Sequence, residues 1–159
     1  MILYHGTTYN RFREIVADKQ IDVSSDANSH YPDSGYCKTT RGYVYLTDNP
    51  LSALEFASKC WTNDNKDSGI RLLSVIKVDI PDKMIEDDID EAKHNSSTIK
   101  STKCYRVKAD IPISSFIEIA FFQLKSFNSC CKYIEKEDYE SIIWSNDTDK
   151  IWNGDIHIL

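Results

Sequence analysis

The stretch Tyr4-His5-Gly6-Thr7 and, about forty residues later, the stretch Gly42-Tyr43-Val44-Tyr45-Leu46-Thr47-Asp48 decide the fold that this chain is expected to adopt. Residues 1–4 and 43–46 are rich in apolar, aromatic and β-branched side chains, which is typical of buried strands. Both strands run directly into signals for the start of a helix. Each stretch therefore predicts the same local unit, a strand that leads into a helix.

The two helix starts are marked by capping residues. Thr8 or Asn10 can cap a helix that continues through 11–16, because a side-chain oxygen at the cap accepts a hydrogen bond from a free backbone N–H. In Asp48-Asn49-Pro50, a capping residue is followed by proline at the first helical position. This second helix is expected to continue to about residue 61.

The rest of the chain contains more strand patterns than helix patterns. Strands are predicted at 71–80, 104–109, 113–122, 141–144 and 155–159, a helix at 84–94, and a long surface loop at 22–41. A chain of 159 residues can bury one ordinary core. We therefore expect an α+β fold in a single domain, 1–159, with two packed mixed or antiparallel sheets and helices mainly in the N-terminal half.

Composition limits the classes of function. The chain has 19 Lys and Arg residues against 25 Asp and Glu residues, a net charge of -6, and its basic residues are scattered. General binding to a nucleic-acid backbone is disfavoured, because such binding depends on clustered cations. No segment approaches the roughly 20 consecutive apolar residues of a membrane span. The N-terminal residues resemble a strand rather than a targeting segment, so we expect a cytoplasmic protein without membrane contact.

Neither cysteine spacing nor acidic runs indicate a metal. The five cysteines are an odd number without paired short spacings, which argues against a disulfide framework and a zinc site. The acidic run 86–91 lacks the regular oxygen spacing and the glycine of a calcium loop. It is more typical of the solvated face of a helix.

The two opening stretches resemble the nucleotide-binding core of NAD-dependent ADP-ribosyltransferases of the diphtheria-toxin and poly(ADP-ribose) polymerase kind, which carry a His, Tyr, Glu pattern. Their first motif resembles His5-Gly6-Thr7, and their second resembles Tyr45-Leu46-Thr47-Asp48 entering a helix. These matches cover the first sixty residues, and the remainder matches only by strand pattern. The resemblance implies that the chain has the fold of this family and takes NAD as co-substrate.

The resemblance also implies roles for individual residues. In the family, the histidine, here His5, hydrogen-bonds the adenosine ribose, and the next residue, here Gly6, offers its backbone to the nicotinamide amide. The absence of a Cβ in Gly6 would allow close approach of a ligand. The family tyrosine stacks on nicotinamide and corresponds to Tyr45, or less closely to Tyr43. The expected NAD-binding residues are His5, Gly6, Thr7, Tyr43, Tyr45 and Ser52.

The third part of the family pattern is a glutamate that heads a late strand, binds the ribose 2′-hydroxyl and stabilises positive charge as the glycosidic bond opens. Glu140, which is followed by Ser141-Ile142-Ile143-Trp144, matches this position. Glu137, Asp138 and Gln123 are rivals for the same role. The expected catalytic residues are Glu140, His5 and Tyr45.

These features predict an enzyme that releases nicotinamide from NAD and passes ADP-ribose to an acceptor, a protein or a nucleic acid, which the sequence does not identify. A free-standing enzyme of this size suggests a microbial toxin or defence effector, with an inhibitory or antitoxin partner. Two alternatives share the fold: an RNA 2′-phosphotransferase, disfavoured by the small number of Arg residues, and a binding module for NAD, ADP-ribose or a protein that has lost turnover. A purely structural or interaction protein is a third.

Overall fold

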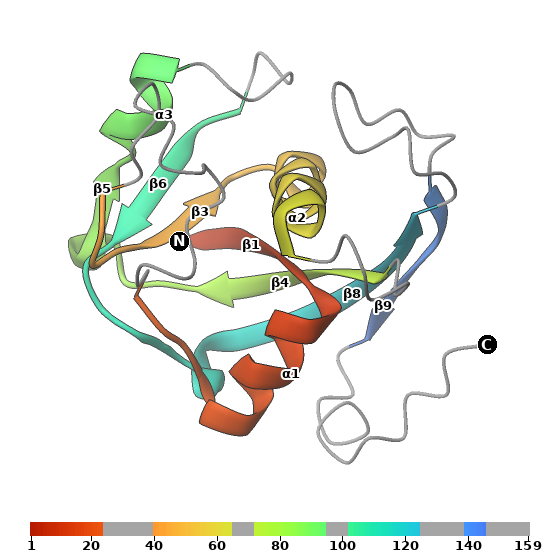
Figure 1. The fold of residues 1–159 in the computed structure, drawn as a ribbon. Coiled ribbons are helices and arrows are strands. Elements are labelled where there is room, and N and C mark those ends of the chain that lie inside the picture. The colour runs from red at the N-terminus through yellow and green to blue at the C-terminus, as the bar shows by residue number, and fades with distance from the viewer. Residues whose placement is uncertain (24–39, 65–71, 95–101, 125–138, 146–159) are drawn as a thin grey trace.

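A seven-stranded antiparallel sheet forms the centre of the molecule (Figure 1). The computed structural model describes residues 1–23, 40–64, 72–94, 102–124 and 139–145. The strand order is β5-β6-β3-β1-β4-β8-β9, and β2 and β7 form a separate two-stranded sheet. The strands are β1 (Ile2–Thr8), β2 (Gln20–Ile21), β3 (Val44–Thr47), β4 (Leu72–Asp79), β5 (Ile85–Asp87), β6 (Cys104–Val107), β7 (Ile111–Pro112), β8 (Phe116–Leu124) and β9 (Tyr139–Ser145).

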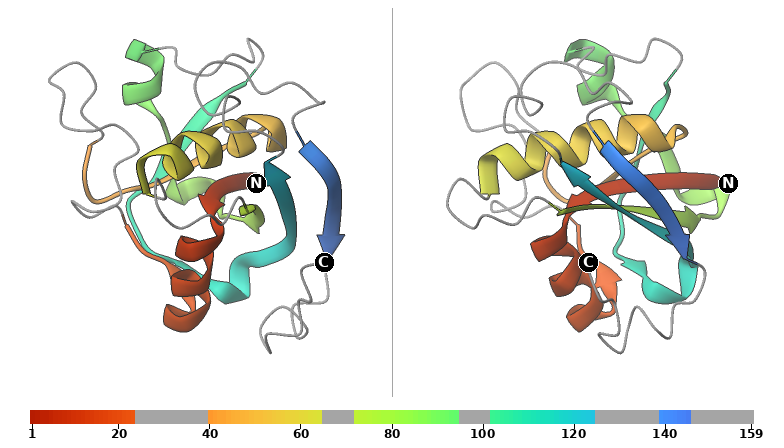
Figure 2. Two further views of the ribbon diagram at one scale, coloured as in Figure 1. Left: turned by 45° about the vertical axis from the view of Figure 1, so that its right-hand side comes forward. Right: turned by 90° about the vertical axis from the view of Figure 1, so that its right-hand side faces the viewer.

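The helices cover both faces of this sheet. Helix α1 (Tyr9–Asp18) lies against one face and helix α2 (Pro50–Asp64) against the other, as the rotated views show (Figure 2). The short helix α3 (Ile89–His94) follows the edge strand β5. Among the described residues the helices all lie before residue 95, so the expected α+β class with helices mainly in the N-terminal half is confirmed. No helix in these ranges is long and apolar enough to cross a membrane.

Two separate cores result, because alternate residues of a strand point to opposite faces. Leu3, Ile76 and Ile119 pack on the α1 side, together with Phe12 and Ile15 of that helix. On the other face, the α2 residues Ala53, Leu54 and Ala57 pack on Leu73, Val75, Ala120 and Phe122. Strand β4 contributes to both cores and is buried on both sides, which explains its nearly continuous apolar sequence.

Most predicted elements are confirmed, with three corrections. Instead of the expected pair of packed sheets, the described residues form one large sheet and a two-stranded ribbon, and their strand pairs are all antiparallel. The expected helix at 84–94 is wrong in its first half, where β5 pairs with β6 along the sheet edge. The strand expected at 113–122 begins at Phe116, after a 3-10 turn at Ile113–Ser115. Most of the predicted loop, and the predicted strand at 155–159, lie outside the described residues.

The helix caps form as the sequence predicts. Thr8 is the N-cap of α1, and its side-chain oxygen accepts a hydrogen bond from the backbone N–H of Arg11 at 3.4 Å. Asn49 caps α2: its side-chain oxygen accepts from the backbone N–H of Leu51 at 2.9 Å, and Pro50 occupies the first helical position. Each of the two opening stretches therefore ends in a helix whose first turn is fixed by its own sequence.

Gly6 allows α2 to lie directly on β1. A Cβ built on Gly6 would come within 1.6 Å of the carbonyl oxygen of Ala53 and 2.5 Å of its carbonyl carbon. Both are backbone atoms of the first turn of α2, so no rotation of a side chain could relieve the contact. The missing Cβ thus serves helix packing, and the close approach that the sequence suggested for a ligand is made here by the helix.

We expect Gly6→Ala to destabilise the protein by about 1–3 kcal/mol or more, because overpacking a tight contact forces a backbone shift. Equilibrium urea denaturation measures this as a lower midpoint. Adding Ala53→Gly should not restore stability, because the clash involves the carbonyl group rather than the Ala53 side chain. An unchanged midpoint in Gly6→Ala would contradict the close contact.

Candidate functional site

A cavity opens where two neighbouring strands separate. Strand β1 pairs with β4 at seven register positions, but with β3 only at Tyr4 and Thr47. Past this point, residues of both strands line a cavity of about 150 Å³. The site is therefore part of the sheet itself, at the incomplete junction between β1 and β3.

The structure brings both predicted motifs to this cavity. His5, Gly6 and Thr7 line it from β1, and Tyr43 and Tyr45 line it from β3 and the residue before that strand. The two groups of residues are separated by about forty positions in the sequence, so the fold is what brings them together.

Ser52 and Glu140 are placed differently. Ser52 is fully buried in the first turn of α2, its hydroxyl lies 2.5 Å from that of Thr102, and it does not line the cavity. Glu140 belongs to β9, where it pairs with Gln123 of β8. Strands β4 and β8 lie between β9 and β1, a separation of roughly 14 Å at about 4.8 Å per strand. The Glu140 side chain, and the rivals Glu137 and Asp138, lie outside the described residues.

His5 connects the two strands where their ladder is missing. Its Nδ1 lies 3.0 Å from the backbone carbonyl oxygen of Tyr45. A carbonyl can only accept, so Nδ1 carries the proton. Burial lowers the pKa of His5 below its usual value, outweighing the opposing effect of this hydrogen bond, and the charge of Arg11 lowers it further. The ring is therefore neutral at pH 7, and its Nε2 is an acceptor.

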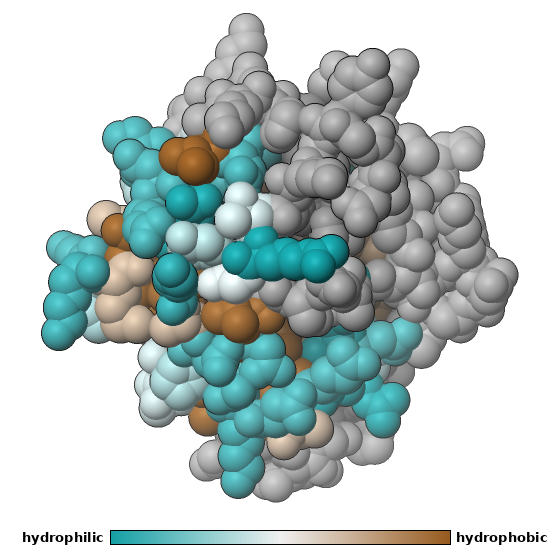
Figure 3. Space-filling model, turned by 60° about the vertical axis from the view of Figure 1, so that its left-hand side comes forward, coloured by the Kyte–Doolittle hydropathy of each residue, from teal (hydrophilic) through white to brown (hydrophobic). Residues whose placement is uncertain are grey.

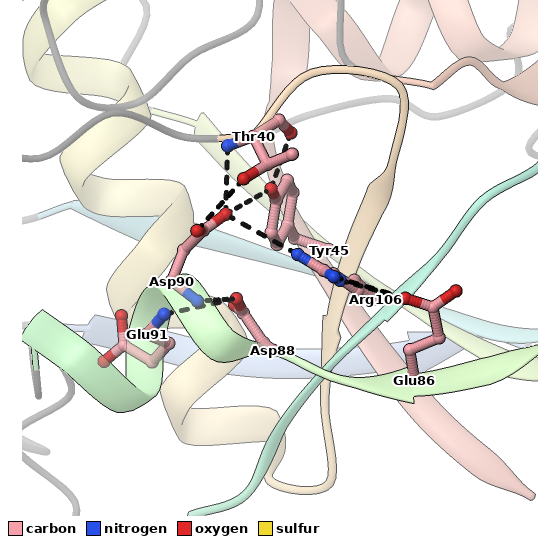
Figure 4. Close-up of polar contacts among 7 residues, drawn as sticks. All are labelled: Thr40, Tyr45, Glu86, Asp88, Asp90, Glu91 and Arg106. Atoms are coloured by element: carbon pink, nitrogen blue, oxygen red, sulfur yellow. Dashed lines mark hydrogen bonds and ion pairs between the residues drawn. The ribbon is translucent and has the colours of Figure 1, made fainter.

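The Tyr45 phenol is held between two acceptors. Its oxygen lies 2.6 Å from the carbonyl oxygen of Thr40 and 2.9 Å from Oδ2 of Asp90 (Figure 4). One phenolic proton serves both, so the hydroxyl is fixed in direction. Burial, and then the hydrogen bond to Asp90 and its charge, raise the pKa of Tyr45 well above its usual value. Tyr45 is thus a neutral, oriented ring in the wall of the cavity.

The acidic run before α3 is structured rather than solvated. Asp88 is buried, and its Oδ1 accepts from the backbone N–H groups of Asp90 at 2.9 Å and Glu91 at 3.2 Å, which caps α3. Asp90 accepts from the N–H of Thr40 at 2.9 Å and from its hydroxyl at 3.0 Å. The expectation of a solvated helix face is therefore wrong for Asp88 and Asp90, because tertiary contacts override the charge pattern.

Strand β6 adds a buried cation behind the tyrosines. The Arg106 guanidinium lies over the Tyr43 ring, 4.2 Å from its centroid. Its Nε and Nη2 donate to Oε2 of Glu86 at 3.3 and 3.2 Å. Its Nη1 lies 4.0 Å from Oδ2 of Asp90. One cation thus lies between the carboxylates of Glu86 and Asp90, as Figure 4 shows, and it also contacts the aromatic face of Tyr43.

Sequence reasoning missed Asp88, Asp90 and Arg106 as parts of the site. A signal existed for Asp88, since an Asp followed three residues later by Glu91 is typical of a capping box. Arg106 stands between Tyr105 and Val107 in a predicted strand, and a single charge in such a strand is often paired when buried. The partners of Arg106 are 16 and 20 positions away, so only the fold identifies them.

The charged side chains of the cavity wall are mostly acidic. Six carboxylates and one guanidinium line it among the described residues: Glu14, Asp18, Asp22, Asp88, Asp90, Glu91 and Arg11. Aromatic groups and the thiols of Cys60 and Cys104 complete it. Burial, and then the charges of nearby carboxylates, raise the pKa of the Cys104 thiol to about 12. That thiol is protonated and a poor nucleophile at neutral pH.

No group of three or more His, Cys, Asp or Glu side chains in the described ranges could hold a metal ion.

The described residues expose no extended apolar surface. Figure 3 shows a face that is mostly hydrophilic, with small separate apolar patches. The large apolar side chains that the described part of the chain exposes are scattered: Met1, Ile2, Leu51, Met84 and Ile89.

No protein-family model matches the chain, and no curated protein matches its sequence. The site is therefore interpreted from its own geometry and from the motif resemblance.

We expect His5 to have a lower pKa in the native protein than in the unfolded chain. At a pH between these two pKa values, the unfolded chain binds protons more readily than the native protein. The free energy of unfolding should then fall as the pH drops from about 7 through 6.5. Comparing this decrease in the wild type and in His5→Gln isolates the contribution of His5 from that of the other three histidines. The variant should lose less stability on acidification, and equal losses would contradict a buried neutral imidazole.

Proposed function

We propose that this protein is an NAD-dependent ADP-ribosyltransferase with the fold of that family. The observation that carries the proposal is the convergence of His5-Gly6-Thr7 and of the Tyr43 to Thr47 stretch on one cavity between β1 and β3. The α+β class and the antiparallel central sheet are compatible with it. We further propose that the protein acts as a microbial toxin or defence effector in the cytoplasm, with an inhibitory partner.

The residues of the cavity fit the nicotinamide end of NAD. A cavity of about 150 Å³ is the size that accommodates a benzene ring, so it accepts one six-membered ring, and the rest of the dinucleotide would extend outside. Tyr43 and Tyr45 supply aromatic walls. The neutral Nε2 of His5 can accept a hydrogen bond from a ribose hydroxyl. The acidic wall favours a cationic ring, which is the charge state of nicotinamide in NAD.

In the proposed reaction, the bond between the ribose C1′ and the nicotinamide nitrogen breaks, and nicotinamide leaves with the bonding electrons. A nucleophile on the acceptor forms the new bond to C1′ and releases its proton. The ribose carries positive charge between these events, so fixed negative charge in a water-poor site lowers the barrier. The protein's tasks are to orient the ribose and to supply that charge.

Two carboxylates are candidates for the charge. Glu140 is the one that the family resemblance indicates, although its strand is separated from β1 by β4 and β8. Glu91 lies in the first turn of α3, lines the cavity, and acts electrostatically on Cys104 across from it. Asp88 and Asp90 of the same acidic run hold backbone and side-chain groups of the protein: Asp88 caps the helix, and Asp90 accepts from Tyr45 and Thr40.

Glu140→Gln and Glu91→Gln should separate these candidates. Loss of the carboxylate that stabilises the transition state is expected to lower kcat for nicotinamide release at least ~100-fold. Each variant is incubated with labelled NAD and a cell lysate, following free nicotinamide and labelled macromolecules. Glu118→Gln is the matched control, because Glu118 pairs with Lys77 and does not line the cavity. Full activity in both test variants would contradict a catalytic role for either glutamate.

His5→Ala and Tyr45→Ala should weaken NAD binding more than they slow the chemical step. Each loses a contact made in both the ground state and the transition state, so KM should rise by about 10-fold with a smaller change in kcat. Isothermal titration with NAD checks the affinity directly. Wild-type affinity in both folded variants would contradict the assignment of the cavity to the nucleotide.

One observation favours a second candidate, a module that binds NAD or ADP-ribose without turnover. Strands β4 and β8 separate the Glu140 strand from β1, so a site with binding groups but no working acid is consistent with the same geometry. A thermal shift with NAD in the absence of nicotinamide release would identify such a module, since ligand that binds only the folded state raises its stability. The RNA 2′-phosphotransferase alternative is weakened, because Arg11 is the single Arg that lines the described cavity.

A further inference from the structure

Arg106 stands at the centre of a row of side chains that crosses three strands. It is directly opposite Tyr45 in the β3–β6 ladder and directly opposite Glu86 in the β5–β6 ladder. Directly opposed residues of an antiparallel pair point to the same face. Tyr43, two residues before Tyr45, shares this face, and the Arg106 guanidinium lies against its ring.

The two tyrosines of the cavity wall are thus linked to one cation by different routes. Tyr43 contacts the guanidinium directly, at 4.2 Å from the ring centroid. Tyr45 is linked through Asp90, whose Oδ2 lies 2.9 Å from the phenol oxygen and 4.0 Å from Nη1 of Arg106. Glu86 holds the opposite edge of the guanidinium through Nε and Nη2.

Arg106 itself does not line the cavity, and only 8% of its surface is exposed. Its Nη1 has no hydrogen-bond partner in the described part of the chain, so its link to Asp90 is electrostatic. An uncompensated buried donor is costly, and the fold retains it beside two ligand-facing rings. An apolar residue would fill the same space without that cost.

We infer that Arg106 is a positioning residue, which fixes both aromatic walls of the cavity by stacking on Tyr43 and by holding Asp90 against Tyr45. The inference rests on the proposed function for its purpose, the orientation of a planar ring between these walls. A lysine could supply the charge, but its ammonium lacks the flat surface and the second edge that reach Tyr43 and Glu86 together.

The pKa of Asp90 gives a test of this inference that does not require enzymatic turnover. Burial raises the pKa of Asp90, but the hydrogen bonds from Thr40 and Tyr45 and the charge of Arg106 outweigh it, and the net pKa lies below its usual value. The same acidic run also carries Glu86, which binds Arg106, and Asp87, Asp88 and Glu91, and Lys93 and His94 follow in α3. Removing the Arg106 charge therefore moves the Asp90 titration to higher pH.

The experiment compares wild type, Arg106→Met, Arg106→Lys and, as a control on the same strand region, Lys108→Met, which removes an exposed charge. Carbon-detected NMR follows the Asp90 carboxyl titration and the ring signals of Tyr43 and Tyr45. In Arg106→Met the Asp90 midpoint should rise and both tyrosine signals should shift. Arg106→Lys should restore the Asp90 midpoint but not the Tyr43 signal, and Lys108→Met should match the wild type.

Kinetics with NAD form the second arm. Arg106→Met should raise KM about 10-fold with a smaller change in kcat, the pattern of a misplaced binding wall. If wild type does not release nicotinamide while the NMR shifts occur, the proposed function fails and the positioning role stands.

A folded Arg106→Met protein with unchanged Asp90 and tyrosine signals overturns the positioning role, whatever its activity. If Arg106→Met does not fold, Glu86→Gln frees one edge of the guanidinium and should shift the Tyr43 signal, and an unchanged signal overturns it equally.

Discussion

Gly6 and Ala53 meet backbone to backbone, and the arrangement of the site follows from that contact. Because Gly6 has no Cβ, the first turn of α2 can lie on the middle of β1. The same turn is capped by Asn49, which directly follows the stretch that contains β3. The end of the second motif is thereby held over the centre of the first. A bulkier residue at position 6 would move the helix, and with it the connection that brings Tyr45 to His5.

The cavity is possible because other interactions replace the missing sheet hydrogen bonds. Strands β1 and β3 share one paired position, so backbone groups beyond it lose their usual partners, and buried groups without partners are costly. The His5 ring compensates by donating to the Tyr45 carbonyl. On the outer side, β3 is fully paired with β6 at four positions, which keeps the separated strand straight. The opening is thus confined to one junction while the rest of the sheet stays continuous.

The sequence predicted the features that depend on local interactions. Strand and helix positions in the first sixty residues followed from apolar patterning and from the caps at Thr8 and Asn49, which act within a few residues. The region 84–94 was only half right, because β5 exists through pairing with β6, a contact about 20 positions away. The packing role of Gly6 was not predicted, for a similar reason. A missing Cβ signals a close approach, but only the fold shows that Ala53 makes one.

The charge arrangement around the cavity has a common physical basis. His5 is neutral because burial makes its protonation costly, and Asp90 is ionised because Thr40, Tyr45 and Arg106 stabilise its charge. Both states are set by neighbours from different strands, so the wall combines a neutral acceptor, oriented phenols and fixed negative charge. Such a wall needs little rearrangement when positive charge develops beside it, since its dipoles already point correctly. A phosphate placed in the same space would face six carboxylates and one guanidinium among the described lining residues. Under the proposed function, the enclosed part of the site would therefore suit a cationic or neutral ring better than a phosphate.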